Sequence, residues 1–243
     1  MKLIVEKDYE ELSRRASEIL VKEIQDNPEI VLGLATGSTP KRMYELLIEE
    51  YKKGSIDFSE VQTFNLDEYI GLSEDNPKSY NYYMQENLFN HINIIPENTH
   101  IPNGKAMNLE SYCKEYEDSI KRAGGIDVQI LGIGTDGHIG FNEPANELEA
   151  ETCVVNLSES TIKANSRFFA SDVMVPREAI TMGVGSILKA KKIILLANGE
   201  KKRNVIKDLL EKPIISTHLP VSLLRLHPNV TIIVDEEAYE GEK

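Results

Sequence analysis

The chain alternates short apolar runs with amphipathic helical segments along most of its length. Ile30–Ala35 is short enough for a buried strand, and Thr36–Pro40 ends it abruptly. The same pattern predicts further strands at Val61–Leu66, Val128–Ile133, Lys192–Ala197 and Val230–Val234. It predicts a helix that Asp8 caps, a helix that begins after Thr39, and helices at Tyr80–Phe89, Ser111–Arg122 and Lys201–Leu210. Strands that alternate with helices predict an α/β fold, with a mostly parallel sheet covered by helices on both faces.

A single domain, residues 1–243, accounts for this pattern, because no linker, repeat or low-complexity tract divides it. The stretch Ala145–Pro176 has the least regular strand pattern. It directly follows a glycine-rich run, Gly132–Pro144, that carries three titratable side chains. We therefore expect Ala145–Pro176 to form a helical flap over a site.

The formal net charge of −13 argues against nucleic-acid binding, since phosphate backbones are held by clustered Lys and Arg. No apolar stretch approaches the ~20 residues of a membrane-spanning helix, and Met1–Asp8 carries charge too early for a secretory signal. Cys113 and Cys153 lack the spacing of a zinc site or a disulfide framework. These features predict a cytoplasmic protein with two free thiols and no membrane segment.

Polar loops follow three of the predicted strands, at Thr36–Thr39, Asp67–Gly71 and Gly134–Glu143. In open α/β sheets, ligands bind beyond the carboxyl ends of the strands, where the strand order reverses. We therefore expect these three loops to meet at one site.

The first loop holds Thr36, Gly37, Ser38 and Thr39, followed by Pro40 at a predicted helix start with Thr39 as its N-cap. Free backbone amides, hydroxyl donors and a helix N-terminus suit a phosphate group. The spacing of neither the Walker motif nor the dinucleotide fingerprint is present, so a nucleotide is not indicated. An ordinary capped turn is the alternative.

The second loop places Asp67 and Glu68 directly after a strand, where we expect the strand to have stopped because Asp is depleted inside strands. One carboxylate could act as a general base while its neighbour, pointing the other way, makes a structural bond. The alternative is a solvated turn.

The third loop combines Asp136, His138 and Glu143. A carboxylate bonded to one ring nitrogen fixes the histidine tautomer and raises the basicity of the other nitrogen, which suits acid–base chemistry. A metal site is the rival, but this loop offers at most three ligands and no second histidine at helical spacing. A serine hydrolase would need a nucleophile elbow that the chain lacks. A buried structural histidine is the remaining alternative.

Two basic positions complete the set of candidates. Arg167 lies beside Phe168 and Phe169 in the expected flap, and Lys201-Lys202-Arg203 opens a helix straight after a strand. Cations at a helix N-terminus oppose the helix dipole, which suggests a nearby anion.

Four motifs in this order resemble the glucosamine-6-phosphate deaminase family: Leu34–Pro40, Asn65–Tyr69, Gly132–Pro144 and Ala164–Phe169. The resemblance implies a Rossmann-like fold and conversion of glucosamine 6-phosphate and water to fructose 6-phosphate and ammonia, without an organic cofactor or catalytic metal. It implies that Asp67 moves a proton from C2 to C1 and that His138 opens the sugar ring, oriented by Asp136 and Glu143. The phosphate would be held by Thr36, Gly37, Ser38, Thr39, Arg167 and Lys202.

Two other readings share this resemblance. The 6-phosphogluconolactonases have a similar Gly-x-Asp-Gly-His loop, but without the Phe141–Pro144 continuation and with Arg where this chain has Tyr69. A non-catalytic sugar-phosphate sensor would be expected to lose Asp67 or His138, and both are present.

The resemblance also bears on regulation. Family members activated by N-acetylglucosamine 6-phosphate carry Ser, Arg and Lys where this chain has Asn146, Cys153 and Val155, and they have a longer C-terminal tail. We therefore expect a monomer or small homo-oligomer that this acetylated sugar does not activate.

Overall fold

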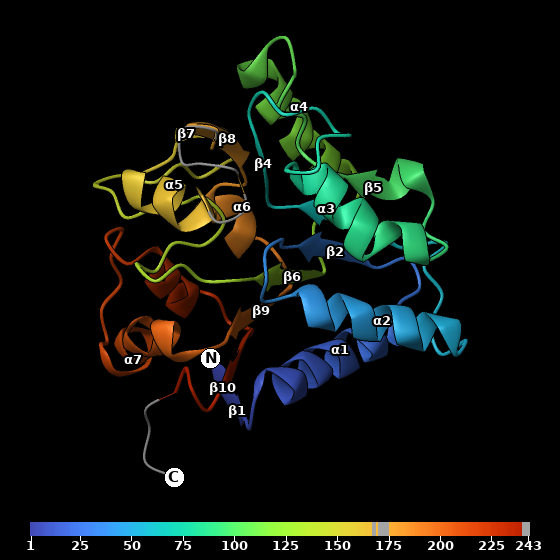
Figure 1. Cartoon of the computed structure of the whole chain (residues 1–243), viewed down its shortest axis with the longest axis horizontal. Helices are drawn as coiled ribbons and strands as arrows, with labels where there is room; N and C mark the ends of the chain where they lie inside the picture. The colour runs from blue at the N-terminus through green and yellow to red at the C-terminus, as the bar shows by residue number, and fades with distance from the viewer. Residues whose placement is uncertain (167–168, 170–174, 240–243) are drawn as a thin grey trace.

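A seven-stranded parallel sheet forms the centre of the protein (Figure 1), seen in a computed structural model that describes residues 1–166, 169 and 175–239. In spatial order the strands are β1 (Lys2–Glu6), β10 (Val230–Asp235), β9 (Lys192–Ala197), β6 (Val128–Leu131), β2 (Val31–Leu34), β3 (Gln62–Asn65) and β5 (Thr99–His100). Every neighbouring pair is parallel. The five predicted strands are therefore confirmed, with their ends shifted by at most two residues.

Helices pack on both faces of this sheet. Crossover connections between parallel strands are right-handed. Helices in connections that run from β1 towards β5 therefore lie on one face of the sheet, and helices in connections that run from β5 towards β10 lie on the other. The first group is α1 (Tyr9–Asp26), α2 (Lys41–Lys52) and α3 (Tyr80–Asn87); the second includes α4 (Leu109–Arg122) and α7 (Arg203–Glu211). Between two helical layers the central strands are apolar and almost fully buried, which is why their runs stand out in the sequence.

The starts of α1, α3 and α4 follow the expected capping chemistry. The Asp8 carboxylate accepts from the backbone N–H of Glu11, as the sequence predicts for α1. Ser79 caps α3 and Asn108 caps α4 in the same way. Shorter elements in the described residues include α6 (Val184–Leu188) and the 3₁₀ turns η1 (Phe89–His91), η2 (Pro96–Asn98), η5 (Glu200–Lys202) and η6 (Pro220–Leu226).

A second, three-stranded antiparallel sheet lies above the carboxyl ends of the main sheet, in the order β4 (Asp67–Tyr69), β8 (Glu178–Thr181) and β7 (Cys153–Asn156). It corrects two predictions. The loop expected at Asp67–Gly71 begins instead with the short strand β4, which pairs with β8; the preceding strand, β3, has stopped at Asn65 as predicted. The 145–176 stretch is not purely helical, because it contributes β7 as well as helix α5 (Glu159–Asn165).

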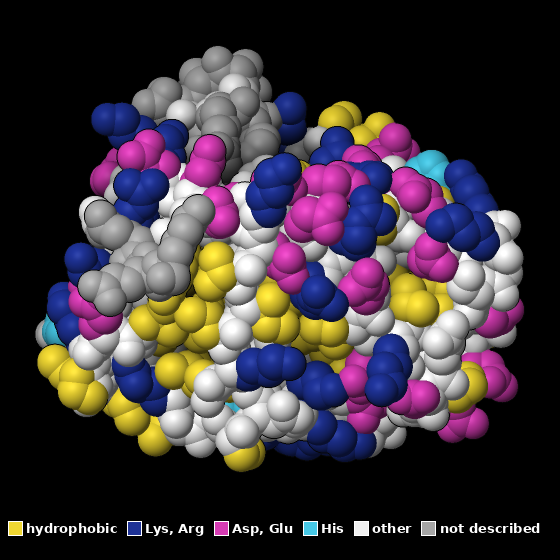
Figure 2. Space-filling model, turned by 90° about the horizontal axis from the view of Figure 1, so that it is seen from below, with side chains coloured by type: hydrophobic (Ala, Val, Ile, Leu, Met, Phe, Trp, Pro, Cys, Tyr) yellow, Lys and Arg dark blue, Asp and Glu magenta, His cyan; other side chains and the backbone are white. Residues whose placement is uncertain are grey.

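The surface is mixed in charge. On the face seen in Figure 2, acidic and basic side chains lie interspersed. Among the described residues, no helix is both long and apolar enough to cross a bilayer. Both cysteines are free, with Cys113 buried and Cys153 partly buried.

Candidate functional site

Four loops meet at one edge of the main sheet. Strands β9, β6, β2 and β3 are neighbours, and the chain runs outward from β2 to β5 on one side and from β6 to β10 on the other. The strand order therefore reverses between β2 and β6, which marks the ligand-binding edge of an open α/β sheet. The loops after these strands carry Lys202, the Asp136–His138 pair, Thr36–Thr39 and Asp67.

The loop between β2 and α2 leaves amide groups without a side-chain cap. Gly37 has a φ of +93°, a conformation that favours glycine. The predicted N-cap role of Thr39 is wrong: its hydroxyl donates to Asn198 Oδ1 at 2.8 Å, and Pro40 occupies the N-cap position with no side-chain bond. Because Asn198 follows β9, this bond ties two of the site loops together. In the first turn of α2, the N–H of Arg42 is bound by the Tyr9 hydroxyl at 3.1 Å, not by Thr39.

Asp67 is a buried carboxylate that is 7 % exposed. Burial, together with the charge of Glu68, raises the pKa of Asp67 to about 8. Its side chain accepts no hydrogen bond within the described part of the chain, and a Cβ placed on Gly140 would lie 3.5 Å from its Oδ2. Asp67 and the glycine-rich loop after β6 therefore face each other directly.

Glu68 points away from Asp67 and makes the structural bonds that the sequence suggested for one of the pair. Its Oε1 accepts from the N–H groups of Tyr69 and Tyr80 at 2.8 and 2.9 Å, and its Oε2 accepts from Asn81 at 2.9 Å. Burial raises the pKa of Glu68, and these backbone donors oppose the shift. Glu68 thus fixes the start of α3 against β4.

Asp136 and His138 form a close pair. His138 Nδ1 lies 2.7 Å from Asp136 Oδ1, which also accepts from the backbone N–H of His138 at 3.2 Å. Burial raises the pKa of Asp136, but the contact with the His138 ring outweighs it and leaves a pKa of about 2. Asp136 is therefore ionised at neutral pH and lies beside Nδ1 of the imidazole, although Nδ1 makes no hydrogen bond of regular geometry within the described residues.

Glu143 contacts the flap helix rather than the histidine. Its carboxylate accepts from the N–H of Ser158 at 2.9 Å and from the Ser158 hydroxyl at 3.0 Å. Ser158 is the N-cap of α5. No ion-pair contact joins Glu143 to His138 in the described parts of the chain, so the structure does not bring Glu143 into the orienting role expected for it.

Of the three consecutive basic residues, Lys202 faces the site. Its ammonium group donates to the carbonyl of Ile133, just after β6, at 2.5 Å. Arg203 turns instead to the carbonyl of Glu237, and Lys201 is exposed. The other predicted cation, Arg167, lies outside the described residues.

Sequence reasoning missed an aromatic layer beside Asp67. Tyr69 packs on Tyr80 and Phe141 with ring centroids 4.9 and 5.7 Å apart. Its hydroxyl accepts from Asn165 Nδ2 of α5 at 2.9 Å and from the Tyr80 hydroxyl at 3.3 Å. The motif Asn65–Tyr69 contains Tyr69, but only the fold brings in residues from α3, α5 and the loop after β6.

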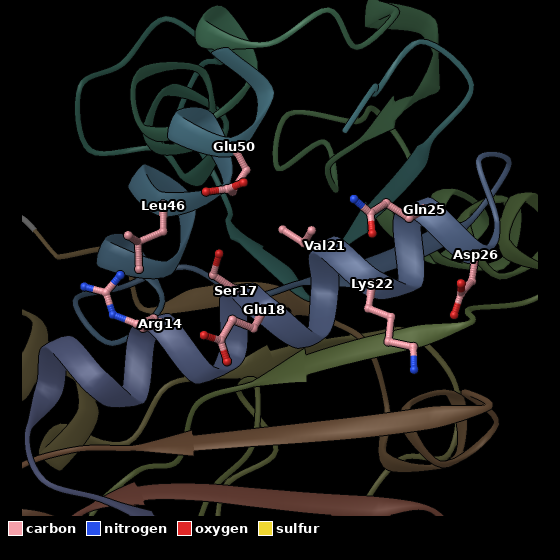
Figure 3. A pocket seen from close by; sticks show the side chains of 9 residues that line it. All are labelled: Arg14, Ser17, Glu18, Val21, Lys22, Gln25, Asp26, Leu46 and Glu50. Atoms are coloured by element: carbon pink, nitrogen blue, oxygen red, sulfur yellow. The ribbon is translucent and has the colours of Figure 1, made fainter. Parts of the chain in front are cut away.

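A surface groove of about 540 Å³ lies elsewhere, between α1 and α2 (Figure 3). Arg14 and Lys22 line it together with Glu18 and Glu50. None of its lining residues comes from the four strand-end loops, so it is separate from the candidate site. No group of three or more His, Cys, Asp or Glu side chains is placed to hold a metal in the part of the chain that the structure describes.

The family model of the glucosamine-6-phosphate isomerases and 6-phosphogluconolactonases matches residues 6–233. The chain belongs to this family. The glucosamine-6-phosphate deaminase of Thermoanaerobacter pseudethanolicus is 60% identical over 98% of this chain and 94% of its own length. A solved structure described as a monomeric glucosamine-6-phosphate deaminase is 45% identical, with a TM-score of 0.95 over 98% of both chains.

The lactonase members of the family share the fold at greater distance. The 6-phosphogluconolactonase from Thermotoga maritima is 21% identical, with a TM-score of 0.75 over 96% of this chain and 98% of that chain. This likeness supports the Rossmann-like α/β architecture and nothing finer. Within the family, the deaminases are thus much more similar to this chain than that lactonase.

Proposed function

We propose that this protein converts glucosamine 6-phosphate and water to fructose 6-phosphate and ammonia. The observation that carries the proposal is the position of Asp67: a buried, unpaired carboxylate that faces the loop of the Asp136–His138 pair. Uncapped amides after β2 and the ammonium group of Lys202 lie at the same edge of the sheet. The 60% identity to a deaminase over nearly the full chain supports the same activity.

In the proposed reaction, His138 promotes opening of the pyranose ring. Nδ1 faces Asp136, which leaves Nε2 as the ring nitrogen for proton transfer with the sugar. The ionised Asp136 stabilises the imidazolium form while the proton is held. Glu143, which we expect to assist this step, contacts Ser158 at the start of α5 and so would act through the position of that helix.

Asp67 then transfers the proton in the open-chain sugar. Its carboxylate removes the proton from C2 while the C1 oxygen takes up a proton, which gives an enolamine. It then returns its proton to C1 while the amino group gives up one, which leaves an imine at C2. Water adds to this imine, and the C–N bond breaks to release ammonia and the ketose phosphate. One carboxylate suffices for both transfers because C1 and C2 are adjacent, and a raised pKa suits a group that must take up and release a proton near neutral pH.

The phosphate group lies away from these reacting carbons. We propose that Thr36, Gly37, Ser38 and Thr39 bind it through the loop before α2, with Lys202 and Arg167 supplying positive charge. Binding energy from this remote group can orient the sugar for the proton transfers. The net charge of −13 makes such a local concentration of donors necessary for an anionic substrate.

A single assay tests the activity. Purified protein should release ammonia and fructose 6-phosphate in equal amounts from glucosamine 6-phosphate, and it should leave 6-phosphogluconolactone at the spontaneous rate of hydrolysis. Heat-denatured protein is the control. Accelerated hydrolysis of the lactone without ammonia release from the amino sugar would replace this proposal with the lactonase activity.

We further expect no activation by N-acetylglucosamine 6-phosphate. We expect activated relatives to carry cationic side chains at the positions of Cys153 and Val155 in β7. Both side chains are uncharged in this chain, so these two positions provide no ion-pair partner for the phosphate of an effector. Initial rates should follow a hyperbola, unchanged by the acetylated sugar, and sedimentation should show a monomer or small homo-oligomer. Sigmoidal kinetics that the effector makes hyperbolic would contradict this expectation. We also propose that the protein is cytoplasmic.

A further inference from the structure

Three tyrosine hydroxyls donate to three backbone carbonyls of the loop after β2. Tyr44 of α2 donates to the carbonyl of Ala35 at 2.6 Å, and Tyr83 of α3 donates to that of Gly37 at 2.7 Å. Tyr9, the first residue of α1, donates to the carbonyl of Ser38 at 2.8 Å. Each hydroxyl comes from a different helix, so the conformation of one short loop is set by three elements of the fold.

Holding these carbonyls also fixes the direction of the amides that follow them. In a planar trans peptide, the N–H of the next residue points opposite to the C=O. The described chain contains no cis peptide. The three hydroxyls therefore set the N–H groups of Thr36, Ser38 and Thr39. Within the described residues, none of these three N–H groups has a protein acceptor.

Without the three tyrosine hydrogen bonds, peptide planes of the loop could rotate so that a carbonyl oxygen, instead of an N–H group, faces the anion. Gly37, with a φ of +93°, gives the loop freedom to rotate its peptide planes. The Thr39 side chain cannot secure the turn as an N-cap, because its hydroxyl is bound to Asn198. Tyr9 also accepts from the N–H of Arg42 at 3.1 Å, which fastens the loop to the first turn of α2.

We propose that Tyr9, Tyr44 and Tyr83 are positioning residues that orient the amides of Thr36, Ser38 and Thr39 for the substrate phosphate. This inference rests on the phosphate-binding role proposed above for the loop. Each hydroxyl binds a carbonyl, which in a trans peptide lies opposite the N–H that would face the phosphate. Their contribution is pre-organisation, which strengthens binding without a contact to the ligand.

The variants Tyr9→Phe and Tyr83→Phe test the proposal, because each removes one hydroxyl and keeps the ring. Each should raise the KM for glucosamine 6-phosphate by about three- to tenfold, the usual effect of losing one hydrogen bond, with kcat within about twofold. Inorganic phosphate should bind more weakly by the same factor in isothermal calorimetry. The double variant should lose about ten- to a hundredfold in phosphate affinity if the two bonds act independently.

Tyr112→Phe is the matched control. Its hydroxyl accepts from the N–H of Asn103 at 3.0 Å, in a loop after β5 that is outside the phosphate loop. This variant should lose a comparable bond without changing phosphate affinity. Thermal unfolding of all variants, without phosphate, measures the general cost of each lost hydroxyl.

Calorimetry keeps this inference separable from the proposed activity, since it needs no turnover. Weakened phosphate binding in the Tyr9 and Tyr83 variants of a protein that does not deaminate would support the inference and refute the activity. Wild-type phosphate affinity in the double variant would overturn the inference even in an active deaminase. A fall in kcat with unchanged KM would also overturn it, because the hydroxyls would then act on the chemistry.

Discussion

Replacing Asp67 by Asn should lower the turnover of glucosamine 6-phosphate by about a hundredfold to ten-thousandfold, the range expected for loss of a general base. Asparagine matches aspartate in size but cannot take up the C2 proton. The carboxylate accepts no hydrogen bond from the described residues, so the amide breaks no existing one there. KM should change less than kcat in steady-state kinetics. Turnover within a few-fold of wild type would remove Asp67 from the role of base.

The raised pKa of Asp67 predicts the pH dependence of the wild-type reaction. The base is active only when ionised, and its pKa of about 8 leaves most of it protonated at pH 7. The value of kcat/KM for the free enzyme should therefore rise with pH and level off above about pH 8. In the Asp67→Asn variant, the residual rate should lose this ascending limb.

Asp67→Asn should also stabilise the folded protein. The direction of the effect follows from the difference in the pKa of Asp67 between the folded and unfolded chains. Below about pH 4, Asp67 is protonated in both the folded and the unfolded chain and carries no penalty. Between pH 4 and 8 the unfolded chain ionises while the folded chain stays protonated, so native stability falls as pH rises. Asp67→Asn removes this loss, and its gain in unfolding free energy should grow over that range to on the order of 1 kcal/mol or more.

Glu68→Gln serves as the neighbouring control. Glu68 accepts three backbone N–H bonds, and an amide nitrogen in place of one oxygen would face a donor. Urea unfolding should therefore show a loss of about 1 to 3 kcal/mol, the cost of an unsatisfied buried donor. A gain in unfolding free energy for Asp67→Asn and a loss for Glu68→Gln would distinguish the destabilising carboxyl group from the one that makes structural bonds. A stabilised Glu68→Gln would contradict the assignment.

The central strands are predictable because they are buried on both sides. β2, β6 and β9 lie between helical layers, so each appears in the sequence as a nearly continuous apolar run. β1 is an edge strand with charged residues at both ends, Lys2 and Glu6, and gives no such run. The small sheet is harder still, since β4 has three residues and gains its burial from partners far along the chain.

In the candidate site, too, contacts between residues close in sequence are predictable and contacts between distant segments are not. The Asp136–His138 contact joins residues two positions apart, so the sequence motif predicts it. Three sets of bonds join segments that only the fold brings together: Thr39 to Asn198, Glu143 to Ser158, and the tyrosine hydroxyls to the loop after β2. Sequence therefore predicts which loops lie together at the candidate site, but not which residues hold those loops in place.

Gly134→Ala should reduce turnover by about a hundredfold, the effect expected when a catalytic group is displaced by about 1 Å. A Cβ at this position would overlap Nδ1 and Cε1 of the His138 ring and come within 2.6 Å of Asp136 Oδ1. The backbone around it is constrained as well, because the Gly134 N–H donates to the carbonyl of His138 at 2.9 Å. The imidazole must therefore move, and the Asp136–His138 contact must lengthen.

Gly132→Ala is the matched control in the same loop. Its φ is not positive, and a Cβ there would meet no atom within 4 Å. Its kcat should stay within about twofold of wild type, and its stability should be equal or slightly higher, since alanine restricts the unfolded chain. The Gly134 variant should instead lose about 1 to 3 kcal/mol of stability through overpacking. Calorimetric phosphate affinity should change far less than kcat in both variants, since the loop proposed to bind the phosphate follows a different strand. Equal activity of the two variants would show that His138 does not need its observed position, and the ring-opening role proposed for it would then have to be given up.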